Sequence, residues 1–187
     1  MLMERDRISQ FISSIYEKLR KFIFSDGDTS LYQLALDLLT LQNSSITICE
    51  TLTGGHITSE FNKCISPAKH LIDNSIVFNN ANSIISNLNC NAQIFRNNGF
   101  VSVESTYEIA STLLEKNNSG FVLVTCGDID KDQMCYIAVG DIDGIHVYKN
   151  TCIGTRDQVV DTVSKCAVFY LIKKPKQNDL FFNKIRV

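Results

Sequence analysis

Residues 45–55, Ser-Ile-Thr-Ile-Cys-Glu-Thr-Leu-Thr-Gly-Gly, constrain the fold of this chain more than any other segment. The first half is typical of a buried strand, because isoleucines alternate with a β-branched threonine. The strand then breaks into a polar turn, and Gly54-Gly55 can open a helix with uncovered backbone N–H groups. A hydroxyl at such a turn is well placed for an active site, since the helix end favours negative charge. The pattern alone favours a tight connection with capping threonines, because it is neither a P-loop nor GxGxxG.

Helix and strand patterns alternate along the rest of the chain and predict an α/β fold. Apolar periodicity indicates helices over residues 29–42, 54–64 and 156–171, one or two short helices over 79–98, and a helix from about 103 to 116. Ser105 and Glu108 have the spacing of a capping box in the last of these. Strands are predicted over residues 46–49, 75–78, 121–126, 134–139 and 145–148. Together these elements predict a three-layer α/β/α sandwich with a mixed sheet.

The two ends of the chain carry different patterns from the middle. Residues 3–24 form an amphipathic helix pattern, in which acidic residues dilute the basic face. Packing on the domain or on a partner is therefore favoured over binding to a membrane surface. We divide the chain into an N-terminal helix at 1–28, a domain at 29–173 and a tail at 174–187. Little regular structure is expected in the tail apart from Leu180-Phe181-Phe182.

Composition argues against several classes of function. The 187 residues have a formal net charge of -2 and no basic stripe with interleaved aromatics, so no nucleic-acid partner is expected. The apolar runs are far shorter than a membrane span, and charged residues at 4–7 interrupt any signal-peptide core. The seven cysteines include no CxxC pair, which argues against a zinc site and for reduced thiols in a cytoplasmic protein. We predict neither a metal nor a cofactor.

Several motifs occur in a fixed order along the chain. Cys49-Glu50-Thr51-Leu52-Thr53-Gly54-Gly55 is followed by Phe78-Asn79-Asn80-Ala81-Asn82-Ser83, then by Gly99-Phe100-Val101-Ser102, Val124-Thr125, Tyr136-Ile137-Ala138 and Gly154-Thr155-Arg156. In this order and spacing they resemble the CinA carboxy-terminal domain family, which includes bacterial nicotinamide mononucleotide deamidases. The resemblance covers roughly residues 31–171. It implies a mostly parallel five-stranded sheet between helix layers, with one strand antiparallel to the others.

The resemblance also implies a catalytic serine, assisted by a lysine and a tyrosine, that attacks a carboxamide. This chain departs from that pattern at all three positions: Thr51 stands at the serine, Phe78 at the tyrosine and Ser83 at the lysine. A hydroxyl needs an adjacent base before it is a useful nucleophile near neutral pH. Because loss of a general base alone costs about 10²–10⁴-fold in rate, we expect weak or no amidohydrolase activity.

The remaining motif residues are predicted to line a pocket for a nucleotide-like small molecule: Glu50, Thr53, Gly54, Gly55, Asn80, Thr125 and Arg156. We therefore interpret the chain as a ligand-binding or regulatory pseudoenzyme, which can also form a homo-oligomer. One alternative is an active amidohydrolase with Thr51 as nucleophile and Glu50 or His56 as helper. A second alternative is a protein-interaction module that uses the N-terminal helix. The sequence leaves all three open.

Other polar residues carry weaker signals. His70 and His146 belong to no recognisable triad. Asp128, Asp130 and Asp132 alternate as in a calcium loop, but the glycine and glutamate of such a loop are missing, so a solvated turn is favoured. Two carboxylates in this loop also disfavour a nearby phosphate. Cys126 is expected to be a buried structural thiol, since no basic residue is placed to lower its pKa.

Overall fold

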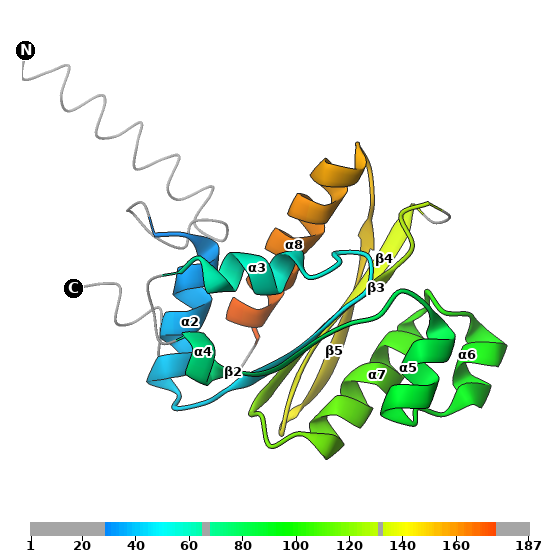
Figure 1. Cartoon of the computed structure of the whole chain (residues 1–187), viewed down its shortest axis with the longest axis horizontal. Coiled ribbons are helices and arrows are strands. Elements are labelled where there is room, and N and C mark those ends of the chain that lie inside the picture. Colours follow the sequence, from blue (N-terminus) through cyan, green and yellow to red (C-terminus); the bar gives the residue numbers. More distant parts are fainter. Residues whose placement is uncertain (1–28, 65–67, 131–132, 175–187) are drawn as a thin grey trace, which may run out of the picture.

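The computed structural model describes residues 29–64, 68–130 and 133–174 (Figure 1). The predicted N-terminal helix, and the predicted tail beyond Lys174, lie outside the described residues. No helix within the described ranges has the length and apolar character needed to cross a bilayer.

A single mixed sheet forms the centre of the molecule. Its strands are β1 Ile46–Glu50, β2 Ile72–Val77, β3 Phe121–Gly127, β4 Met134–Asp141 and β5 Gly144–Thr151. They lie in the order β2-β1-β3-β4-β5. Strand β1 pairs in parallel with both β2 and β3, whereas β4 is antiparallel to β3 and β5. The predicted five-stranded sheet with one antiparallel strand is confirmed.

Helices cover both faces of this sheet (Figure 1). One face carries α2 Leu31–Leu41, α3 His56–Asn62, α4 Ala68–Leu71 and α8 Arg156–Ile172, and the other carries α5 Ala81–Leu88, α6 Ala92–Asn98 and α7 Val103–Lys116. Helix α8 packs on α2, α3, β3 and β4, while α7 packs on β3, β4 and β5 from the opposite side. The three-layer sandwich is therefore confirmed.

Two neighbouring inner strands, β1 and β3, are buried along their whole length. Successive residues of a strand point to opposite faces, so these strands supply two separate cores. Ile48 and Leu123 belong to the core under α2 and α8, whereas Cys49 and Val124 belong to the core that includes Ile109 of α7. Burial on both faces explains why these strands read as continuous apolar runs in the sequence.

Three local predictions were wrong or incomplete. Strand β2 begins at Ile72 and not at Ser75, and the prediction missed this because the polar, exposed residues Asp73 and Asn74 interrupt the apolar pattern at this edge strand. The short helix α4 was not predicted. The capping box at Ser105 was also wrong: the Ser102 hydroxyl caps α7 by accepting from the Ser105 N–H at 3.1 Å. Glu108 instead accepts from the backbone N–H of Asn91 at 2.7 Å.

The end of α8 is tied to the β4–β5 turn by a buried ion pair. Lys174, 3% exposed, pairs its ammonium with the carboxylate of Asp141, which is 9% exposed. The Lys174 ammonium also lies 6.0 Å from the centre of the Phe121 ring. A second lysine–aspartate pair, Lys165–Asp161 on the surface of α8, joins side chains that are 58% and 48% exposed.

These two lysine–aspartate pairs allow a matched test of how burial changes the contribution of an ion pair to stability. Lys174→Met should lower the free energy of unfolding by about 3–5 kcal/mol, because it leaves the Asp141 carboxylate buried without its cation. Lys165→Met should cost no more than about 1 kcal/mol, since water screens that pair. Urea unfolding followed by circular dichroism measures both values. Equal losses in the two variants would contradict a structural role for the buried pair.

Candidate functional site

The carboxyl ends of β1, β2, β3 and β5 meet at one edge of the sheet, because these strands run in the same direction. Open α/β sheets bind their ligands at such an edge. The Thr51–Gly55 turn follows β1, Phe78 follows β2, and Gly127 ends β3. Most of the residues singled out in the sequence are thus carried to one side of the molecule.

The Glu50 carboxylate is fully buried and caps the N-terminus of α3. Its Oε2 accepts from the backbone N–H of Gly55 at 3.0 Å and of Ile57 at 3.1 Å. Its Oε1 accepts from the backbone N–H of Thr58 at 3.0 Å and from the Thr58 hydroxyl at 2.8 Å. Four donors around one carboxylate, at the positive end of a helix, stabilise its negative charge.

Gly54 and Gly55 make this arrangement possible. Their φ angles are +59° and +93°, in the region that L side chains rarely adopt. The reversed backbone aims the N–H of Gly55 at the Glu50 carboxylate. The anion site at the start of α3 is therefore occupied by the chain's own Glu50, which the sequence suggested as a helper base.

The Thr51 hydroxyl is bound entirely to backbone. It accepts from the N–H of Gly127 at 3.0 Å, and the carbonyl oxygens of Thr125 and Gly127 lie 3.0 and 3.2 Å from it as acceptors. The side chain is only 8% exposed. It fastens the end of β1 to the end of β3, and its proton points to a carbonyl and not to a base.

A second pair of hydroxyls reinforces the same junction. The oxygens of Thr53 and Thr125 lie 2.8 Å apart, and both side chains are buried. The structure therefore brings together two residues predicted separately as ligand contacts. In this geometry the two hydroxyls hydrogen-bond to each other in the interior of the turn.

The Phe78 segment lies beside the turn but serves α5. The Phe78 N–H donates to the Glu50 carbonyl oxygen at 2.9 Å, and its ring is buried in the core beneath α5–α7. Asn80 caps α5 by accepting from the Ser83 N–H at 2.9 Å. The Ser83 hydroxyl donates back to the Asn80 carbonyl at 2.8 Å. The Phe78 ring is thus part of the core, and the Ser83 hydroxyl is part of the α5 cap.

Arg156 begins α8 on the same edge of the sheet and pairs with Asp130 at 2.5 Å. Both side chains are largely exposed. A cavity of about 440 Å³ opens beside this pair, lined by Ile129, Gln133, Cys152, Ile153, Gly154 and Val159. Its lining comes from the β3–β4 loop, the β5–α8 connection and Val159 of α8, so it lies on the half of the edge away from β2.

The weaker candidates have ordinary structural surroundings. The His56 Nε2 lies 3.9 Å from the Glu60 carboxylate one turn along α3. Asp128 accepts from the N–H of Asp130 at 3.1 Å, as in a surface turn, and Asp132 lies outside the described residues. His70 and His146 are exposed. Among the residues that the structure describes, no group of three metal-ligating side chains could hold an ion.

A sequence model of the CinA C-terminal domain matches residues 28–174. The chain belongs to this family. Over 120 residues it is 26% identical to a CinA-like protein of Dictyoglomus thermophilum, in a match that covers 64% of this chain and 29% of that protein. The chain spans less than half the length of the curated relatives it matches.

Crystal structures of CinA superfamily proteins share the fold. A protein from Klebsiella pneumoniae has a TM-score of 0.72 at 16% identity, with 77% of this chain and 94% of that chain covered. A protein from Escherichia coli has a TM-score of 0.73 at 15% identity, with 83% and 97% covered. The predicted family and fold are confirmed, whereas the roles of the site residues in this CinA domain stay predictions.

Two residues that hold the site together, Thr58 and Gly127, were not predicted from the sequence. Thr58 completes the shell of Glu50 and also lies 2.5 Å from the hydroxyl of Ser75 on β2. Gly127 holds the Thr51 hydroxyl through its backbone, and no side-chain pattern signals that contact. A buried glutamate followed by Gly-Gly and a helical threonine could have pointed to Thr58, because the carboxylate needs donors.

Replacement of the buried carboxylate tests its role in the turn. Glu50→Gln should lower the free energy of unfolding by about 1–3 kcal/mol, because the new amide N–H₂ faces backbone donors. Glu60→Gln, on the α3 helix that Glu50 caps, is the control and should cost less than about 1 kcal/mol, since its partners are partly exposed. Chemical denaturation measures both. A Glu50→Gln variant as stable as Glu60→Gln would show that the capping is dispensable.

The Cys126 thiol is fully buried and donates to the Phe100 carbonyl, with sulfur and oxygen 3.3 Å apart. Burial raises the pKa of this thiol to about 12. At pH 8 almost no thiolate forms, so the native protein should leave Cys126 unmodified by N-ethylmaleimide. Half-buried Cys64 is the internal control and should react faster.

Peptide mapping by mass spectrometry reads out the two cysteines in native protein and in urea. Urea should make them equally reactive. Rapid modification of Cys126 in the native state would contradict its assignment as an inert structural thiol.

Proposed function

We propose that this CinA-family chain binds a nucleotide-like small molecule at the carboxyl edge of its sheet and does not catalyse the amidohydrolase reaction that the family resemblance implies. The proposal rests on one observation: the Thr51 hydroxyl makes all of its described hydrogen bonds with the backbone of Thr125 and Gly127. A nucleophile must instead deliver its proton to a base.

The groups that could act as that base are either absent or engaged. Phe78 and Ser83 replace the tyrosine and lysine of the family pattern, and Ser83 is part of the α5 cap. The Glu50 carboxylate accepts four hydrogen bonds that hold α3. Use of Glu50 as a proton acceptor would break the turn that positions Thr51.

His56 is the remaining helper named in the sequence. Its imidazole lies beside Glu60 at 3.9 Å, along α3. An imidazole supports catalysis only within hydrogen-bond reach of the hydroxyl it deprotonates. The described contacts of Thr51 include three backbone groups and not His56, which supports a binding function over a catalytic one.

Ligand binding is supported by the cavity near Arg156. A guanidinium recognises a carboxylate or phosphate through two parallel hydrogen bonds. Here the exposed pair with Asp130 would have to open, since the aspartate competes with an anionic ligand for Arg156. The cavity beside it, about 440 Å³, offers the apolar side chains of Ile129, Ile153 and Val159 to a ring. Such a lining is typical of a small-molecule site.

Restoration of the family residues tests the proposal. The triple variant Thr51→Ser, Phe78→Tyr, Ser83→Lys should release ammonia from nicotinamide mononucleotide, whereas the unaltered chain should not. Serine lacks the γ-methyl group that fixes the threonine χ1 angle, so its hydroxyl can leave the backbone acceptors and face the new lysine. Coupled detection of ammonia gives the rate, and isothermal titration gives the affinity.

The matched control is the triple variant with alanine in place of serine at position 51. It keeps the tyrosine and lysine but has no nucleophile, so it should bind the mononucleotide without release of ammonia. Ammonia release by the unaltered chain, abolished by Thr51→Ala, would overturn the proposal and establish an active amidohydrolase. Failure of a folded triple variant to bind the mononucleotide would refute a nucleotide site at this edge.

A further inference from the structure

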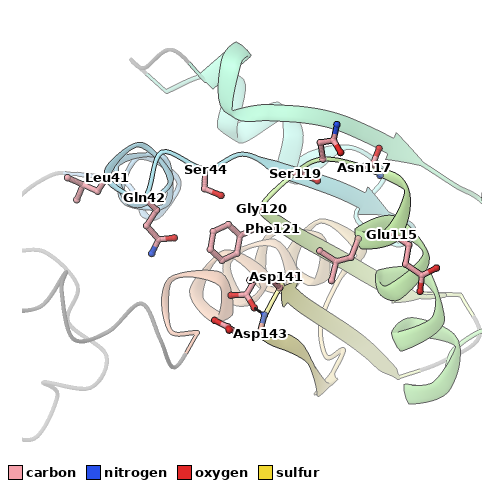
Figure 2. Close-up of a pocket in the computed structure, with 13 residues that line it drawn as sticks. Leu41, Gln42, Ser44, Glu115, Asn117, Ser119, Gly120, Phe121, Asp141 and Asp143 are labelled. Atoms are coloured by element: carbon pink, nitrogen blue, oxygen red, sulfur yellow. Dashed lines mark hydrogen bonds between the residues drawn. The ribbon is translucent and has the colours of Figure 1, made fainter.

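A second cavity lies at the opposite edge of the sheet, where β1 and β3 begin and β4 ends (Figure 2). Its volume is about 850 Å³, and 13 residues line it. Ser44 precedes β1, Phe121 begins β3, and Asp141 ends β4. This cavity is distinct from the candidate site, which is formed by the carboxyl ends of the parallel strands.

Exposed apolar side chains lie at the rim of this cavity. Leu41 at the end of α2 is 56% exposed, and Ile142 in the β4–β5 turn is 98% exposed. Single exposed apolar residues are common on protein surfaces. Leu41 and Ile142 both line this cavity, so together they present apolar surface at its rim.

The charge of the cavity is negative. The described residues that line it include the carboxylates of Glu115, Asp141 and Asp143 and no lysine or arginine. A cation reaches this place from the end of α8: Lys174 pairs with Asp141 and lies above the Phe121 ring. Lys174, the last residue that the structure describes, thus has its ammonium beside this cavity.

Residues 175–187 follow Lys174 directly and match the cavity in chemistry. They contain the apolar cluster Leu180-Phe181-Phe182, and Lys176, Lys184 and Arg186 outnumber their one acidic residue, Asp179. The stretch from Lys174 to Leu180 can span up to about 20 Å, which is ample to cross a cavity of this volume.

We propose that Leu180-Phe181-Phe182 of the same chain binds in this cavity against Leu41 and Ile142. The cations of the segment face Glu115, and the Lys174–Asp141 pair anchors its start. Because the segment is tethered at the cavity, its effective concentration there is in the millimolar range of short linkers, and weak contacts suffice. This inference does not depend on the function proposed for the opposite edge.

The absence of tryptophan from the chain gives a direct test. Phe181→Trp in the full chain introduces a single fluorophore into the segment. We expect blue-shifted emission and poor quenching by acrylamide, because the indole is buried. Adding Leu41→Gln with Ile142→Ser should red-shift the emission and raise the quenching constant. Both altered side chains are exposed, so the fold should be retained.

Two further variants test whether the segment binds at this edge of the sheet and not at another apolar surface. Ile153→Ser, at an isoleucine that is 80% exposed on the opposite edge, is the matched control and should leave the fluorescence unchanged. Lys184→Glu with Arg186→Glu alters only the segment and should red-shift the emission like the cavity pair. A solvent-like spectrum of Phe181→Trp, or an equal response to Ile153→Ser, would overturn the proposal. So would a blue shift that grows with protein concentration, since a second copy would then be the partner.

Discussion

The buried carboxylate of Glu50 is the interaction on which the carboxyl edge of the sheet depends. A charge removed from water is costly unless donors replace its hydration, and here three backbone N–H groups and one hydroxyl do so. Because those donors belong to the first turns of α3, the carboxylate fixes where that helix begins. Thr58 extends the network to Ser75 on β2, and the Glu50 carbonyl receives the N–H of Phe78. The side chain and the backbone carbonyl of Glu50 together thus align β1, α3 and the end of β2.

The positions of Thr51 and Thr53 follow from that alignment. With Glu50 held, the chain turns so that the two threonine hydroxyls meet the end of β3 at Thr125 and Gly127. The same residues that look like ligand contacts in the sequence therefore join neighbouring strands in the fold. The turn therefore has a structural role of its own, which is independent of the function proposed for this edge.

The sequence predicted the architecture well where burial sets a pattern. Strands β1 and β3 are recognisable because both of their faces are covered, and α2 and α8 because apolar residues repeat along one face. Strand β2 was placed too late because the polar, exposed residues Asp73 and Asn74 follow its first residue, Ile72, at the sheet edge. The capping box of α7 was misplaced because two serines, Ser102 and Ser105, lie near the start of the helix and either could cap it. In the fold the Ser102 hydroxyl caps the helix, whereas the Ser105 hydroxyl donates to the Gly99 carbonyl.

The site was harder to predict for a physical reason: its decisive contacts join side chains to backbone atoms. The proximity of Thr51 to the motif after β2 could be inferred from spacing, but the hold of Gly127 on the Thr51 hydroxyl could not. These hydrogen bonds also give Thr51 a structural role that the sequence pattern does not indicate. A serine could make the same hydrogen bonds, but it would visit other rotamers. The γ-methyl of Thr51 restricts χ1, so its hydroxyl is held more rigidly against the end of β3 than a serine hydroxyl would be.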